Sequence, residues 1–149
     1  MQNNEENKQL QVFIADDSAM VRERLVSMLC DVEGVEVAGE AEDVLQATDL
    51  IRELKPDAVT LDIRMPGGTG LDVLKQIRRD VPQFQQAPVV IMLSNYSHAL
   101  YRRKAMDAGA NFFFDKSTEF EKVRDVLLSM TGSQQNAASN EPSRGDAGR

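Results

Sequence analysis

The chain has 149 residues, of which 42% are hydrophobic and 28% charged, a size and composition that suit one compact domain and exclude wholesale disorder. Its net charge of -7 and pI near 4.7 argue against direct binding of nucleic acid through a basic face. The sequence shows neither a membrane-spanning apolar run nor the parts of a signal peptide, and its single cysteine cannot form an internal disulfide. We therefore expect a cytoplasmic protein that does not bind membranes.

The two ends of the chain differ in composition from its middle. Residues 1–9 are mostly Asn, Gln and Glu, and residues 133–149 contain no Val, Ile, Leu, Met or aromatic residue. Such segments bury too little apolar surface to offset the entropy lost on ordering. We therefore predict disordered tails at residues 1–9 and 131–149, on either side of a domain at residues 10–130.

Between the tails, short apolar segments alternate with amphipathic segments. The apolar segments, rich in Val, Ile, Leu and Phe, predict strands covered on both faces at residues 10–15, 35–38, 58–61, 89–93 and 112–114. The amphipathic segments predict helices near residues 21–29, 44–54, 70–81, 97–108 and 120–130. Repeated βα units with short connections predict an α/β fold, a five-stranded parallel sheet with helices on both faces.

Polar residues stand where the predicted strands end. Asp16 and Asp17 follow the first strand, Asp62 the third, Ser94 the fourth, and Lys116 comes just after the fifth. In sheets of this kind, ligands bind beyond the carboxyl ends of the strands. Taken singly, the acidic pair is typical of a helix start and the lysine of a surface charge, but their joint occurrence favours a site. Crowded carboxylates repel one another unless a cation such as Mg²⁺ binds them, which indicates phosphoryl chemistry on a metal.

Four segments at these positions resemble a known family. IADDSAMVRERL, VTLDIRMPGGTGLDVL, VVIMLSN and FFFDKS are similar, in order and spacing, to the conserved segments of the receiver domain of two-component response regulators. The resemblance covers about residues 10 to 130 and is to the stand-alone, chemotaxis-regulator-like type. It implies a flavodoxin-like sheet with the strand order 2-1-3-4-5.

The resemblance also implies how a metal and a phosphoryl group are bound. Asp62 matches the aspartate that is phosphorylated. Asp17 and the backbone carbonyl of Arg64 match the Mg²⁺ ligands beside Asp62, and Asp16 matches the acid that supports the metal through water.

Three further positions match residues that respond to the phosphoryl group. Ser94 is expected to contact this group after transfer, and Lys116 to pair with it. Phe113 matches the aromatic whose rotamer reports the state of the domain.

Other positions are expected to control how long the phosphoryl group persists. In receivers, the side chains at the positions of Arg64 and Tyr96 flank the path by which water reaches the acyl phosphate. Neither is an acid that could orient water, and Asn95 replaces a smaller residue. We therefore expect all three to slow hydrolysis.

The resemblance predicts a signalling switch. Asp62 would accept a phosphoryl group from a sensor histidine kinase or phosphotransfer protein, and the modified domain would change its affinity for a protein target. We expect no enzymatic activity beyond its own phosphorylation and dephosphorylation.

Three alternatives remain at this stage. One is a magnesium-dependent phosphohydrolase with an aspartate nucleophile; enzymes of that type resembling haloacid dehalogenases carry a second aspartate, the general acid and base, at the position of Arg64. Another is a flavin-binding module, but Asp16 and Asp17 would repel the phosphate of the flavin. The chain could also be the receiver fragment of a longer DNA-binding regulator, which would need about 60 more residues with a basic helix.

Arg102, Arg103 and Lys104 form a basic cluster in the fourth predicted helix. We interpret this cluster as a solvated helix face rather than an anion-binding site.

Overall fold

The computed structural model describes residues 9–83, 86–95 and 99–140. Its centre is one five-stranded sheet in the order β2-β1-β3-β6-β7, with each neighbouring pair parallel. The strands are β1 Leu10–Ala15, β2 Val35–Ala41, β3 Ala58–Leu61, β6 Val89–Ser94 and β7 Phe112–Asp115. Counting only these strands, the order is 2-1-3-4-5, so the predicted fold class and topology are confirmed.

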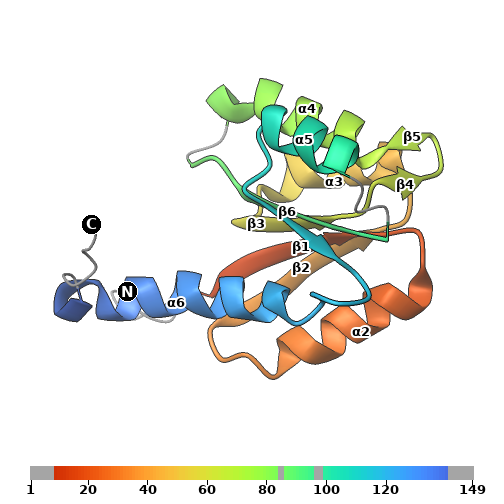
Figure 1. The fold of residues 1–149 in the computed structure, drawn as a ribbon. Coiled ribbons are helices and arrows are strands. Elements are labelled where there is room, and N and C mark those ends of the chain that lie inside the picture. Colours follow the sequence, from red (N-terminus) through yellow and green to blue (C-terminus); the bar gives the residue numbers. More distant parts are fainter. Residues whose placement is uncertain (1–8, 84–85, 96–98, 141–149) are drawn as a thin grey trace.

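Helices cover both faces of the sheet, as Figure 1 shows. The helices α3 Val44–Leu54, α4 Gly70–Arg79 and α5 Ala99–Asp107 lie on one face, and α2 Ala19–Cys30 and α6 Lys122–Asn140 lie on the other. Each face has its own core, because side chains alternate along a strand. Val59 and Leu61 of β3 join the core beneath α3, α4 and α5, whereas Ala58 joins the core beneath α2 and α6.

Local sequence explains why several helices begin where they do. The hydroxyl of Ser18 accepts the backbone N–H of Val21 at the start of α2, directly after the two acids that follow β1. Thr69 and Asp72 form a reciprocal capping box at the start of α4. Between β3 and α4 the chain forms a small antiparallel pair, β4 Arg64–Met65 and β5 Gly68–Thr69. These caps fix the helix starts beside the carboxyl ends of the strands.

The structure extends several elements beyond their predicted ends. Strand β2 continues to Ala41 because β1 supplies backbone partners along that length, with an irregularity between Val12 and Phe13. Helix α6 continues to Asn140, ten residues into the segment at 131–149 that composition predicts to be a tail. That segment lacks apolar periodicity but has no proline before Pro142, so helical hydrogen bonding can continue there. The remaining tail residues, 1–8 and 141–149, lie outside the described residues.

Within the described part of the chain, no helix is both long and apolar enough to cross a membrane. A short 3₁₀ helix at Val81–Gln83 follows α4.

Candidate functional site

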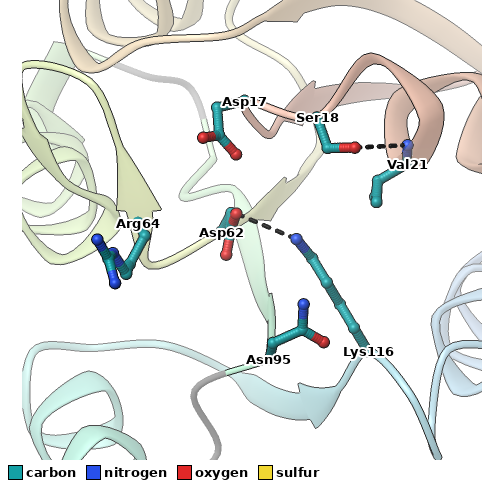
Figure 2. A pocket seen from close by; sticks show the side chains of 7 residues that line it. All are labelled: Asp17, Ser18, Val21, Asp62, Arg64, Asn95 and Lys116. Atoms are coloured by element: carbon teal, nitrogen blue, oxygen red, sulfur yellow. Dashed lines mark hydrogen bonds and ion pairs between the residues drawn. The ribbon is translucent and has the colours of Figure 1, made fainter.

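The carboxyl ends of β1, β3, β6 and β7 surround a pocket of about 370 Å³. Figure 2 shows the side chains that line it. They are Asp17, Ser18, Val21, Asp62, Arg64, Asn95 and Lys116. The pocket brings together residues from distant parts of the sequence, from Asp17 to Lys116, and it lies where the sheet topology predicts a ligand.

Three carboxylates meet at this pocket. Asp16, Asp17 and Asp62 each offer an oxygen, and these oxygens all lie within 4.8 Å of one another. Asp16 is 2% exposed and Asp62 5% exposed, whereas Asp17 is exposed. Burial first, and the negative charge of Asp16 second, raise the pKa of Asp62 to about 6, although Lys116 and the backbone of Ile63 act in the opposite direction. The folded chain therefore holds a carboxylate whose ionised form is disfavoured until a cation compensates it.

Lys116 is the cation within the protein that compensates part of this charge. Its Nζ lies 2.7 Å from Oδ2 of Asp16 and 3.1 Å from Oδ2 of Asp62. Burial alone would lower the pKa of Lys116, but hydrogen bonds and charges from both acids outweigh it and raise that pKa. Lys116 is therefore charged at neutral pH and bridges the two buried carboxylates, one of them as drawn in Figure 2.

Backbone groups fix the two buried acids from the other side. The N–H of Ser18 donates to Oδ1 of Asp16 at 2.9 Å, and the N–H of Ile63 donates to Oδ1 of Asp62 at 2.7 Å. Asp16 thus has a protein partner on each oxygen. Among the described residues, no hydrogen bond or ion pair to the exposed carboxylate of Asp17 is found. Asp17 is therefore the acid most available to a metal ion.

Gly70 sets the position of the Asp62 backbone, a role that the sequence pattern does not predict. Its N–H donates to the carbonyl of Ile63 at 2.7 Å, and a Cβ at this position would overlap the carbonyl oxygen of Asp62. Only glycine allows this approach between the start of α4 and the end of β3. The one signal in the sequence is a glycine at the start of a helix, which alone does not indicate contact with a site.

The donor set fits a hard divalent cation. Carboxylate oxygens are the ligands that Mg²⁺ prefers, and three of them converge here beside the ammonium group of Lys116. The residues that would hold the ion are Asp17 and Asp62, with Asp16 beside them. The predicted participation of the Arg64 carbonyl stays a prediction.

The remaining predicted site residues lie around these acids. Ser94 is fully buried at the end of β6, in register with Asp115 of β7. Arg64 on β4 and Asn95 after β6 are exposed and line the pocket. In Figure 2 the guanidinium of Arg64 is directed away from Asp62. Tyr96, the third residue expected to slow hydrolysis, lies outside the described residues.

Phe113 is 3% exposed on β7 and belongs to the core beneath α3, α4 and α5. The guanidinium of Arg102 lies over its ring, with Cζ 4.9 Å from the centroid, and Nη1 donates to the carbonyl of Phe113 at 3.0 Å. Arg102 is exposed, as the predicted solvated helix face requires, but its side chain also contacts β7. Its helix position marks it as exposed, and only the packing of α5 on β7 shows its partner.

Known proteins resemble this chain in sequence and in fold. A family model for the response regulator receiver domain matches residues 12–128. The chain is 34% identical over 117 residues to a protein-glutamate methylesterase/protein-glutamine glutaminase of Methanospirillum hungatei, covering 78% of this chain and 34% of that protein. It is 30% identical over 125 residues to the response regulator GacA of Pseudomonas aeruginosa, covering 84% and 56%.

A solved response regulator domain also has the same fold as this chain. The response regulator domain of CheB from Thermotoga maritima superposes with a TM-score of 0.68 at 31% identity, covering 91% of this chain and all of that one. By contrast, the chain spans only about a third to just over half of the two curated relatives named above.

One sequence prediction has to be corrected in the light of these relatives. The receiver motifs predict no enzymatic activity beyond the domain's own phosphoryl chemistry, yet several relatives are named protein-glutamate methylesterases. The prediction is wrong, because a receiver domain sequence does not exclude enzymatic activity: proteins named as enzymes match most of this chain. The match covers about a third of each of those proteins, so it does not establish a methylesterase activity for this chain either.

The family match covers most of the described domain, and the sheet order and acidic pocket agree with it. Receiver domains of this kind belong to two-component systems and bind Mg²⁺ at an acidic pocket. The chain belongs to the response regulator receiver domain family.

Proposed function

We propose that this receiver domain is a switch in which Asp62 accepts a phosphoryl group from a histidine kinase or a phosphotransfer protein. The observation that carries the proposal is the buried Asp62 carboxylate within 4.8 Å of two further acids, with Lys116 bridging two of the three. The modified domain would then bind a protein target with a different affinity. We place this exchange in the cytoplasm, since neither the composition nor the described helices suggest a membrane role.

Asp62 supplies the nucleophile. With a pKa of about 6, its carboxylate is mostly ionised at neutral pH. One oxygen would attack the phosphorus of a phosphohistidine, forming an O–P bond as the P–N bond breaks and the electron pair leaves with the imidazole. Hydrogen bonds from Ile63 and Lys116 hold the carboxylate in place for this attack. Mg²⁺, when bound by Asp17 and Asp62, would neutralise charge on the phosphoryl oxygens.

After transfer, the new phosphoryl group offers acceptors that the free carboxylate lacks. Lys116 already reaches Asp62 and would pair with a phosphoryl oxygen. The hydroxyl of Ser94, buried at the end of the neighbouring strand, would donate a hydrogen bond to another. These contacts would exist in only one state, so they bias the conformation of β6 and the chain that follows it.

The change would reach the surface through Phe113. Phe113 pairs in register with Met92, two residues before Ser94, and Met92 and Phe113 share a core cluster. Because side chains alternate along a strand, Ser94 and Phe113 lie on the same face of the sheet. A displacement of Ser94 would therefore alter the space available to the ring and the packing of α5. We propose the face formed by α5, β7 and α6 as the surface that presents the change to a target.

The proposal is tested by phosphorylation in vitro. Incubation with Mg²⁺ and acetyl phosphate should add one phosphoryl group, measured by intact-protein mass spectrometry. Asp62→Asn should abolish the addition, and a chelator should have the same effect. Asp49→Asn, a change of the same kind at an exposed position on α3, should leave it intact. Modification that survives in Asp62→Asn would refute the assignment of the phosphoacceptor.

The assignment of Asp17 as a metal ligand is tested by measuring Mg²⁺ affinity. Asp17→Asn should weaken Mg²⁺ binding by about tenfold or more, because it removes the most exposed acid of the cluster. Unchanged Mg²⁺ affinity in this variant would show that Asp17 is not a ligand.

A further inference from the structure

Phe113 receives two contacts from a single side chain of α5. Cζ of Arg102 lies 4.9 Å from the centroid of the Phe113 ring, and Nη1 of Arg102 donates to the Phe113 carbonyl at 3.0 Å. Arg102 is otherwise exposed, whereas the ring that it covers is buried. The hydrogen bond holds the guanidinium at the position from which it also contacts the ring.

These contacts tie α5 to β7. Ala105 of α5 is fully buried in the same core cluster as Phe113. The exposed Arg102 of the same helix therefore lies at the edge of this cluster, between the Phe113 ring and solvent. The described part of α5 begins at Ala99, only five residues after Ser94. Any motion of Ser94 transmitted along the chain would therefore reach the helix that carries Arg102.

We propose that Arg102 is a positioning residue that holds the Phe113 ring in its buried position. It would thereby favour the conformation that a phosphoryl group on Asp62 stabilises. This inference rests on the proposed function and deepens it, since it names a residue that sets how readily the switch responds. Arg102 acts through Phe113 and touches neither Asp62 nor the phosphoryl group.

The chemistry of the guanidinium explains why arginine suits this position. A cation over the face of an aromatic ring is attracted by the negative charge of the π face. The planar guanidinium can lie against the ring while one of its N–H groups donates to a carbonyl. A lysine ammonium is a compact point charge without this planar fork. Arg102→Lys should therefore recover only part of the effect, although it keeps the charge.

The neighbouring Arg103 provides a matched control. It lies on the same helix with the same charge and is also exposed. Among the described residues, no hydrogen bond, ion pair or ring contact of Arg103 is found. Arg103→Gln thus changes the net charge of α5 as Arg102→Gln does, without removing a contact to Phe113.

The test uses the full chain with Mg²⁺ and beryllofluoride, an anion that mimics a phosphoryl group on a carboxylate. NMR titration would give the beryllofluoride affinity, and selectively ¹³C-labelled phenylalanine would report the Phe113 ring. Arg102→Gln should weaken beryllofluoride binding about three- to fivefold and shift the ring signal of Phe113. Arg103→Gln should match the parent in both measurements. In a Phe113→Leu background, Arg102→Gln should have no further effect on affinity.

The outcomes separate this inference from the function on which it rests. If Arg102→Gln and Arg103→Gln bind beryllofluoride equally and leave the ring signal unchanged, the inference is refuted while the proposed function stands. The same conclusion follows if Arg102→Gln weakens binding equally with Leu at position 113. If the parent chain itself fails to bind beryllofluoride with Mg²⁺ present, both the proposed function and this inference are refuted.

Discussion

Replacing Asp62 with asparagine should stabilise the metal-free protein. Asp62 is 5% exposed, and burial together with the charge of Asp16 raises its pKa from 3.8 to about 6. Each tenfold change in proton affinity corresponds to about 1.4 kcal/mol, so the ionised carboxylate costs the folded state about 3 kcal/mol at neutral pH. The amide removes this cost. Lys116 keeps a partner in the variant, because its Nζ also lies 2.7 Å from Asp16.

The gain in stability should depend on pH with a defined sign. Well below its unfolded-state pKa of 3.8, Asp62 is protonated in both the folded and unfolded states, so the charge contributes nothing to the difference. Between about pH 4 and pH 6 the folded state binds more protons than the unfolded state, and the free energy of unfolding of the parent falls as pH rises. Above pH 6 the full cost is present. The advantage of Asp62→Asn should therefore be small near pH 4 and complete at pH 7.5.

Urea unfolding followed by far-ultraviolet circular dichroism would measure this effect. With a chelator at pH 7.5, Asp62→Asn should exceed the parent by about 2 to 3 kcal/mol in its free energy of unfolding. Saturating Mg²⁺ should stabilise the parent more than the variant and reduce the gap. Asp49→Asn, at an exposed position, should change stability by less than about 0.5 kcal/mol. An equal gain at pH 4 and pH 7.5, or no gain at all, would refute the electrostatic reasoning.

Three further predictions concern stability and metal binding. The hydroxyl of Thr60 is buried without a hydrogen-bond partner among the described residues, so Thr60→Val should raise the free energy of unfolding by about 1 kcal/mol in urea; a loss would contradict this. Gly70→Ala should lower the free energy of unfolding by about 3 kcal/mol and weaken Mg²⁺ binding, because the new Cβ would overlap the Asp62 carbonyl. Gly132→Ala, where a Cβ would meet open space, is the control and should leave stability unchanged or slightly higher. Lys116→Met removes the ammonium that neutralises two of the acids, so calorimetric titration should show about tenfold tighter Mg²⁺ binding; weaker binding would show that Lys116 helps to organise the metal site.

Much of the fold can be predicted from local sequence. The bounds of β1 and β3 agree with the predicted strands at 10–15 and 58–61, because strands covered on both faces are continuous apolar runs that end abruptly at polar residues. Ends decided by tertiary partners are less predictable. Strand β2 reaches Ala41 because β1 pairs with it along that length. Helix α6 has a different reason: it reaches Asn140, although the apolar periodicity stops at Met130, because no proline before Pro142 interrupts its backbone hydrogen bonds.

The sequence by itself determined which polar groups stand at the strand ends. Asp16, Asp17, Asp62 and Lys116 each follow a short apolar segment, and parallel strands bring such positions to one edge of the sheet. This local pattern was sufficient to predict an acidic site and the residues that form it, and it required no knowledge of distances.

Only the tertiary structure decided how those groups interact. The bridge from Lys116 to Asp16 and Asp62 joins residues 54 or more positions apart. The burial that raises the pKa of Asp62 also depends on how the strands beside β3 pack. Likewise, Arg102 is one more basic residue on a helix until α5 packs on β7 and places its guanidinium over Phe113. Hydrogen bonds and solvation change over a few ångströms, whereas a sequence pattern fixes only the element and face on which a side chain lies.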